Sequence, residues 1–265
     1  MHLQTGGVMS STSFIKIFDS IAKHNHRYTI FSDFVTLSAI SLHNAVNKLE
    51  HLEAEYMEII GKYTKEEANK FSKLLAELIN MLEAEPKDVL GGLYMELNLS
   101  NNKTGQFFTP NHISELMAKI SYDDDLRELK KPFITLSEPA CGAGGMVLAF
   151  IKVMLSHNLN PAERLWVQCI DIDRIAALMC YIQLSLWNIP AQVYVGNTLT
   201  LEFRERFFTP AHYLYGWREK LLFEKVADLS TNKARTDASN ETLQKVDKQT
   251  ITPHIANNSD QLNLF

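Results

Sequence analysis

Apolar residues recur every three or four positions through most of the first hundred residues, a pattern that predicts helices. Two helices are predicted here. The later one is expected to begin at Thr64, because Glu67 stands three positions later as in a capping box, and to continue to Leu82. The stretch 14–34 predicts another helix and a strand-like segment. We therefore expect a helical domain over residues 1–100. The helix that precedes Thr64 is predicted from the spacing of its apolar residues, which are Leu42, Val46, Leu49, Leu52, Tyr56 and Ile59.

Beyond residue 130 the pattern changes to short apolar runs, at 133–136, 165–170 and 192–195, with a helix-type run at 146–155 after the first. This alternation predicts an α/β fold with a Rossmann-like sheet. The residues after Asn197 are too few and too polar to complete a doubly wound sheet, so we expect an incomplete one within 101–226. The remainder, 227–265, is largely Ser/Thr/Asn/Lys/Asp-rich and predicts a disordered tail.

A glycine-rich loop, Glu138-Pro-Ala-Cys-Gly-Ala-Gly-Gly145, joins the first predicted strand to the following helix. Strand, glycine turn and helix form the architecture of nucleotide-handling loops. Gly142, Gly144 and Gly145 allow a sharp turn and a close approach to a ligand. The loop therefore predicts a site for a small adenosine-containing cofactor.

The spacing within the loop narrows the choice of cofactor. A dinucleotide fingerprint requires a third glycine where Val147 stands, and a P-loop requires Lys followed by Ser or Thr where Met146 and Val147 stand. NAD, ATP and GTP are thus disfavoured. An uncharged loop with Glu138 at its mouth suits a cationic ligand such as S-adenosylmethionine.

Polar residues also follow the next two predicted strands. Asp171-Ile-Asp173 ends the second strand, where a carboxylate accepts hydrogen bonds from ribose hydroxyls, and Asn197 ends the third. Open α/β sheets bind ligands at the carboxyl ends of their strands. We therefore expect three strand ends to meet at one crevice.

These motifs, together with Thr104-Gly-Gln-Phe-Phe-Thr-Pro110, resemble in order and spacing the bacterial N6-adenine DNA methyltransferases, especially the modification subunits of type I restriction-modification systems. The resemblance covers about residues 100–200. It implies adenine-specific DNA methylation with S-adenosylmethionine, whose methionine half lies at 107–110 and 138–144, ribose at Asp171 and adenine edge at Asn197. The implied cofactor residues are Thr104, Gln106, Phe107, Phe108, Thr109, Pro110, Glu138, Pro139, Cys141, Gly142, Gly144, Asp171, Ile172 and Asn197.

The catalytic motif of that family, (Asp/Asn)-Pro-Pro-(Tyr/Phe), does not occur in the sequence, which contains no Pro-Pro pair. The motif accepts protons from the poorly nucleophilic exocyclic amine and stacks an aromatic ring on the flipped base. The stretch 200–213 is charged and aromatic and lacks the expected apolar strand. Pro210-Ala-His-Tyr213 keeps a proline and an aromatic residue but no suitable acid or amide. No catalytic residue is assigned, and a partner subunit is expected to complete the fold.

A net charge of −5 does not favour direct binding to DNA, so DNA is expected as an indirect or assisted partner. One segment, 203–225, is basic and aromatic, with Arg204, Arg206, Arg218, Lys220 and Lys225 among six aromatic rings. Such a mixture can grip a nucleic-acid strand by charge and stacking. The alternative is an amphipathic segment that packs its rings on the core.

Three cysteines without zinc-like spacing, Cys141, Cys169 and Cys180, are typical of a cytoplasmic protein. No metal is expected, because methyl transfer from a sulfonium requires alignment and removal of a proton rather than a Lewis acid. The longest apolar run, 146–155, is too short to span a membrane, and no leader pattern begins at Met1.

The last five residues form a separate signal, Gln261-Leu-Asn-Leu-Phe265. Exposed leucines and a phenylalanine at the end of a polar tail indicate a binding partner. The pattern is similar to the peptide with which bacterial replication and repair proteins bind the DNA sliding clamp, which assigns partner contacts to Gln261, Leu262, Leu264 and Phe265. The alternative is that this terminus folds back as a short strand on its own domain.

Two functions remain open from the sequence. The chain is either an adenine-N6 DNA methyltransferase whose catalytic strand is rearranged or borrowed, or a catalytically inactive cofactor-binding adaptor or modulator near replicating or mobile-element DNA. The cofactor motifs fit both functions equally. The missing catalytic motif favours the adaptor, whereas Glu138, Asp171 and Asn197 indicate that ligand binding is retained.

Overall fold

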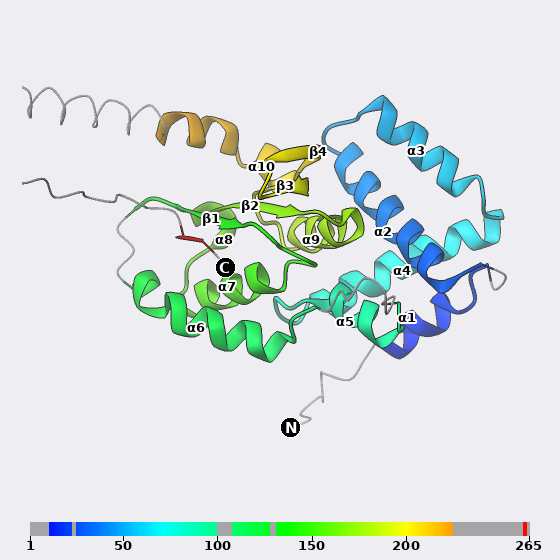
Figure 1. Ribbon diagram of the computed structural model, residues 1–265, viewed down its shortest axis with the longest axis horizontal. Coiled ribbons are helices and arrows are strands. Elements are labelled where there is room, and N and C mark those ends of the chain that lie inside the picture. Colours follow the sequence, from blue (N-terminus) through cyan, green and yellow to red (C-terminus); the bar gives the residue numbers. More distant parts are fainter. Residues whose placement is uncertain (1–10, 23–24, 100–107, 128–130, 225–261, 264–265) are drawn as a thin grey trace, which may run out of the picture.

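The computed structural model describes residues 11–22, 25–99, 108–127, 131–224 and 262–263 (Figure 1). Five helices form the amino-terminal part. The helix α4 begins with the predicted capping box, in which the Thr64 hydroxyl accepts from the amide of Glu67 and the Glu67 carboxylate accepts from the amide of Thr64. The five helices are α1 (Ser11–Phe18), α2 (Arg27–Asn44), α3 (Glu50–Ile60), α4 (Lys65–Leu82) and α5 (Val89–Glu96).

Two expectations for this region are wrong. The predicted helix through 42–59 is divided between α2 and α3, and no strand occurs in the described part of 14–34, which belongs to α1 and α2. The division follows from Asn44, whose side-chain oxygen accepts from the amide of Leu49 while its side-chain nitrogen donates to Glu53. Asparagine side chains compete with helix hydrogen bonds in this way.

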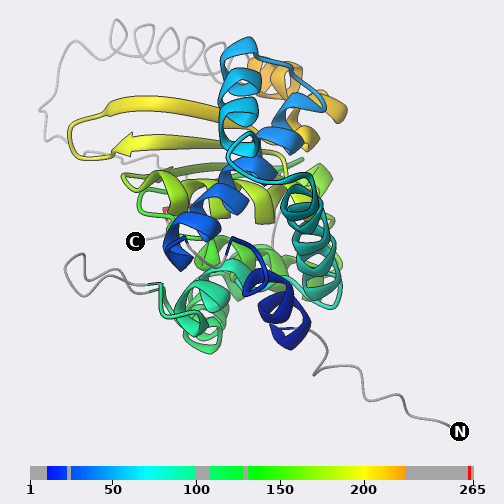
Figure 2. The ribbon, with the colours of Figure 1, turned by 90° about the vertical axis from the view of Figure 1, so that its right-hand side faces the viewer.

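The centre of the sheet is formed by three neighbouring parallel strands, β1 (Ile134–Glu138), β2 (Leu165–Asp171) and β3 (Ala191–Asn197). Its order is β4-β3-β2-β1-β5, and β4 (Glu202–Phe208) is antiparallel to β3. Figure 2 shows the hairpin of β3 and β4 reaching out past the helices. These three strands overlap the predicted runs and extend beyond them by one or two residues, and the mixed α/β class is confirmed.

One face of the sheet is covered by α7 (Gly145–Ser156) and α9 (Arg174–Leu186), which connect β1 to β2 and β2 to β3. Right-handed crossovers place both helices on the same face. The helix α6 (Asn111–Arg127) packs on α7, and α2 packs on α9. A continuous apolar core extends from Phe14 to Phe207, so the helical part and the sheet share buried surface. The predicted boundary at residue 100 stays a prediction.

The opposite face of the sheet carries a second, smaller cluster formed by Phe133, Trp166 and Trp217. The indole nitrogen of Trp217 donates to the carbonyl of Ala162, in the short helix α8 (Pro161–Arg164). Residues 217–224 are helical and follow α10 (Pro210–Leu214). Part of the basic and aromatic segment 203–225 therefore packs its rings on the sheet, as expected for an amphipathic segment.

The edges of the sheet differ from expectation at two places. The charged stretch after Leu199 forms the strand β4, although no strand was expected there. At the other edge, β5 (Leu262–Asn263) pairs in parallel with Leu136 and Ser137 of β1. The predicted tail, 227–260, lies outside the described residues, as do Gln261, Leu264 and Phe265 of the carboxyl-terminal peptide. No helix in the described ranges is long and apolar enough to cross a membrane.

Candidate cofactor site

Hydrogen bonds join the carboxyl ends of the three parallel strands. The Cys141 amide donates to the carbonyl of Ile170 at 2.9 Å, and the Gly142 amide donates to the Asp171 carboxylate at 2.7 Å. The Thr198 hydroxyl donates to the carbonyl of Pro139. The glycine loop after β1 is thus fixed to the ends of β2 and β3, and the three strand ends converge as expected.

Two loop glycines adopt backbone conformations that other residues rarely accept. Gly142 has φ +52°, and a Cβ there would lie 3.3 Å from the ring of Phe108. Gly144 has φ +92°, and a Cβ there would lie 2.9 Å from Sγ of Cys180. The left-handed conformation and the close neighbours together explain why glycine is required at both positions.

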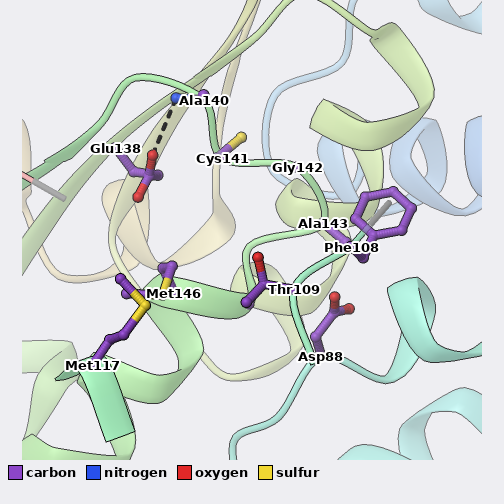
Figure 3. A pocket seen from close by; sticks show the side chains of 11 residues that line it. Asp88, Phe108, Thr109, Met117, Glu138, Ala140, Cys141, Gly142, Ala143 and Met146 are labelled. Carbon is purple, nitrogen blue, oxygen red and sulfur yellow. Dashed lines mark hydrogen bonds between the residues drawn. The ribbon is translucent and has the colours of Figure 1, made fainter. Parts of the chain in front are cut away.

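A pocket of about 250 Å³ lies at this loop (Figure 3). In this view Glu138 stands on one side, with its carboxylate accepting from the amide of Ala140 at 3.1 Å, and Asp88 and Phe108 stand on the other. The described lining includes two carboxylic acids and no basic side chain. Its residues are Asp88, Phe108, Thr109, Met117, Glu138, Ala140, Cys141, Gly142, Ala143, Gly145 and Met146.

The helical part of the chain holds one wall of this pocket. Asn111, at the start of α6, accepts from the Asp88 amide at 2.9 Å and donates to the Asp88 carbonyl at 3.3 Å. Phe108 packs edge-on against Tyr94 of α5, with ring centroids 5.3 Å apart. These contacts bring residues 108–110 beside the glycine loop, although the two segments are far apart in sequence.

Gln183 of α9 links the same wall to the loop. Its side-chain nitrogen donates to the Asp88 carboxylate at 3.0 Å and to the Ala143 carbonyl at 2.7 Å, while its oxygen accepts from the amides of Val89 and Leu90. Gln183 is fully buried, so all four bonds are made away from water. Sequence reasoning missed both Asp88 and Gln183, because nothing local marks an aspartate at a helix start as a pocket residue.

Both acids of the pocket are held toward their neutral forms. Burial raises the pKa of Glu138 to about 7, against the opposing bond from the Ala140 amide, and burial also raises the pKa of Asp88. A cation in the pocket would stabilise their ionised forms. The site is therefore suited to a ligand with a positive end.

The predicted ribose and adenine residues lie at the ends of β2 and β3. Both carboxylate oxygens of Asp171 accept backbone amides, from Gly142 and Asp173, and burial raises the pKa of this group. The side chain of Ile172 is 63% exposed. The Asn197 side-chain oxygen accepts from the amide of Leu199 at 2.9 Å. None of the three borders the pocket at the loop, which occupies the methionine side of the predicted site. Thr104, Gln106 and Phe107 lie outside the described residues.

The segment 210–213, which could have replaced the catalytic motif, lies at the amino ends of the parallel strands. Thr209 donates its amide to the carbonyl of Ala191, the first residue of β3, whereas the cofactor loop meets the last residues of that strand. The seven residues of β3 separate its two ends by about 20 Å. Pro210-Ala-His-Tyr213 is therefore not a replacement for the catalytic motif.

The structure also gathers the three cysteines, which their spacing did not indicate. The Sγ atoms of Cys141, Cys169 and Cys180 all lie within 4.8 Å of one another and are buried. Contacts among the thiols, together with burial, leave the pKa of each above its ordinary value. The thiols are therefore neutral near pH 7, and they pack as small apolar side chains behind the loop.

Comparisons with known proteins agree with the family that the motifs resemble. The model of the N-6 DNA methylase family matches residues 85–215. No curated protein matches the chain.

Two solved structures are similar at 16% identity and a TM-score of 0.31 each. One is a putative class I S-adenosylmethionine-dependent methyltransferase from Listeria monocytogenes, with 63% of this chain and 52% of that chain covered. The other is the methyltransferase subunit of a type I restriction-modification system from Streptococcus thermophilus, with 62% and 38% covered. The chain thus spans about half or less of the length of these proteins, and it carries, over residues 85–215, a domain of the N-6 DNA methylase family.

Proposed function

We propose that the chain binds S-adenosylmethionine at the carboxyl ends of β1, β2 and β3 and forms the cofactor-binding part of an adenine-N6 DNA methyltransferase. The observation that carries this proposal is the glycine loop, tied to Asp171 and bordered by the acids Glu138 and Asp88. The family to which residues 85–215 belong supports the same chemistry.

Each end of the cofactor has a partner of suitable chemistry. The sulfonium and ammonium groups are cations, and Glu138 and Asp88 are the acids beside which they would lie. The Asp171 carboxylate accepts hydrogen bonds from two backbone amides and keeps further lone pairs for the ribose hydroxyls. The exposed side chain of Ile172 and the side chain of Asn197 complete the adenosine side.

The proton acceptor for the adenine amine comes, in this proposal, from a partner subunit. The three parallel strands follow the order 3-2-1 of one half of a doubly wound sheet, in which the other half begins beside the first strand. Among the described residues, that edge of β1 is paired with β5 alone, through Leu136 and Ser137. A strand from a partner would pair there and place its catalytic residues beside the methyl donor.

The second candidate is an inactive adaptor that binds the cofactor and docks on the DNA sliding clamp through 261–265. The missing catalytic motif favours it. Leu262 and Asn263 pair with β1 in the structure, so clamp binding and this pairing exclude each other for these two residues. Either occupant of the β1 edge, β5 or a partner strand, leaves the cofactor crevice unchanged. We expect the protein in the cytoplasm, where its free thiols stay reduced.

The test combines calorimetry with a transfer assay. Titration of the purified chain with S-adenosylmethionine is expected to show one-to-one binding, and tritiated methyl transfer to unmethylated DNA is expected only when a partner subunit is present. Transfer by the chain alone would contradict the need for a partner. Binding without transfer under any pairing would select the adaptor, and absence of binding would overturn the cofactor proposal itself.

A further inference from the structure

A second and larger pocket, of about 770 Å³, lies at the amino-terminal edge of the sheet, away from the cofactor loop. It is bordered by the end of α2 and the turn into α3, by β2, β3 and β4, and by α10 and the helical residues 217–224. The described lining contains no acidic residue. Its members are His43, Asn47, Leu49, Trp166, Gln192, Arg206, Phe208, His212, Tyr213, Arg218, Leu221 and Leu222.

Aromatic rings form one wall of this pocket. The ring of Phe208 stacks on His212 at 4.4 Å with an interplanar angle of 20°, and Trp166 lies 5.0 Å from His212. Tyr213 stands edge-on to Phe208 at 6.2 Å and is 39% exposed. The buried rings hold Phe208 and Tyr213 in place, so a planar ligand would meet a rigid surface rather than mobile side chains.

Two arginines supply positive charge beside that wall. Arg206 and Arg218 are exposed, and neither forms an ion pair with a described residue. The Arg206 guanidinium lies over the ring of Phe208, 5.2 Å from its centroid. Arg174, by contrast, is bound by Glu55 and Glu205. The arginines at the pocket therefore remain available to an anion, whereas Arg174 does not.

Two buried histidines also border the pocket, and one ring nitrogen of each has no hydrogen-bond partner among the described residues. These nitrogens are the Nδ1 atoms of His43 and His212, whose side chains are 1% and 6% exposed. Burial lowers the pKa of both rings, so they are neutral near pH 7. A buried polar atom without a partner costs about 1–3 kcal/mol.

We propose that this pocket binds a nucleotide, with its base against the exposed ring of Tyr213 and its phosphate between Arg206 and Arg218. An aromatic wall beside unpaired arginines is the combination that holds nucleic-acid bases by stacking and the backbone by charge. Asn47 and Gln192 provide polar contacts for base edges or sugar hydroxyls. The nucleotide is either free or part of a single strand.

The site is separate from the cofactor crevice, because it meets the first residues of β3 and the last of β4, whereas the crevice meets the opposite ends of β2 and β3. It also gives the acidic chain a local basic surface. Binding here does not depend on the proposed methyl transfer, so the experiment can be run without S-adenosylmethionine.

The test measures fluorescence anisotropy of a labelled oligothymidylate of about ten nucleotides, a length within the usual range for single-strand sites. The double variant Arg206→Gln/Arg218→Gln and the variant Tyr213→Ala are each expected to bind at least about tenfold more weakly, as loss of stacking or of paired charges predicts. The matched control is Lys65→Gln/Lys73→Gln on α4, which removes the same charge from exposed positions elsewhere and is expected to leave affinity within about twofold.

Competitors separate the two sources of the ligand. Thymidine monophosphate that displaces the oligonucleotide identifies a free nucleotide as sufficient, and displacement only by unlabelled single strand identifies the strand. Wild-type protein that does not bind the oligonucleotide, equal weakening in the lysine control, or equal competition by inorganic phosphate would each overturn the proposal. The two charge variants change exposed side chains, and their thermal melting is expected to match that of the wild type. Tyr213→Ala also removes ring packing, so its binding is measured below its own melting transition.

Discussion

The two ends of the parallel strands differ in how their polar groups are satisfied. At the carboxyl ends, Gly142 donates to Asp171 and Thr198 donates to Pro139, and no described basic side chain lines the pocket beside the two acids. At the amino ends, Arg206 and Arg218 line a pocket in which no described residue is acidic. One edge is thus organised for a cation and the other for an anion. A single sheet can therefore carry two sites of opposite charge preference.

The largest expected effect concerns Gln183, which joins α5 to the cofactor loop. Gln183→Met keeps the volume of the side chain but removes four buried hydrogen bonds and leaves Asp88 without one of its partners. We expect the free energy of unfolding to fall by about 3–5 kcal/mol, since each unsatisfied buried group costs about 1–3 kcal/mol. Urea denaturation measures this loss. A loss below about 1 kcal/mol would show that the two parts of the chain do not depend on this residue.

The next effect concerns the glycine loop. Gly144→Ala places a Cβ 2.9 Å from Cys180 in a left-handed conformation, so we expect destabilisation of about 2–4 kcal/mol and loss of cofactor binding. Gly92→Ala is the matched control, because a Cβ there meets no atom within 4 Å and lies in α5. The control is expected to gain about 0.5–1 kcal/mol. Equal behaviour of the two variants in urea denaturation would contradict the strain assigned to Gly144.

A third effect concerns the amino ends of the parallel strands. The Thr209 hydroxyl accepts from the amide of Ala191 at 2.8 Å and donates to the carbonyl of Ile189 at 2.6 Å, both buried. Thr209→Val is expected to lower the free energy of unfolding by about 1–3 kcal/mol while cofactor affinity stays unchanged. Calorimetric titration beside thermal melting checks both. A change in cofactor affinity would mean that the two edges are coupled.

The pH dependence of cofactor binding follows from Glu138. Its pKa of about 7 means that the carboxylate is ionised at pH 8 and largely protonated at pH 6. Because the ionised form attracts a cation, S-adenosylmethionine is expected to bind several-fold more tightly at pH 8 than at pH 6. Calorimetry at both values measures the ratio, and Glu138→Gln should remove it. A ratio retained in that variant would assign the titration to another group.

The same group affects stability in the opposite sense. In the cofactor-free protein the folded state keeps the Glu138 proton up to about pH 7, whereas the unfolded chain releases it near 4.5. The folded state therefore holds more protons between these values, and the contribution of this group to stability declines as pH rises from 4.5 to 7. Chemical denaturation at pH 5 and pH 7 is expected to show a smaller decline in Glu138→Gln than in the wild type.

Local sequence predicted much of this arrangement and missed what depends on distant contacts. The strands β1, β2 and β3, the capping box at Thr64 and the glycine turn are each encoded within a few residues, and the structure contains all of them. The division of α2 from α3 depends on one asparagine side chain. The strand β4 has a charged sequence, which only pairing with β3 turns into a strand. Tertiary pairing overrides local pattern in such cases.

The candidate site shows the same division. Glu138, Gly142 and Phe108 were predicted from motifs and border the pocket. Asp88 and Gln183 were not predicted, because their roles arise from contacts between residues 93 to 95 positions apart along the chain. The cysteine cluster likewise needs β2 and α9 to be placed beside the loop. Residues brought together by folding carry no spacing signal in a single sequence.

The most direct test of the central claim is a crystal structure of the chain with S-adenosylmethionine at pH 8. We expect the methionine end beside Glu138 and Gly142, with the ribose hydroxyls at the Asp171 carboxylate and the amino-terminal pocket free of cofactor. A crevice that stays empty at saturating cofactor, or cofactor bound instead beside Arg206 and Tyr213, would contradict it.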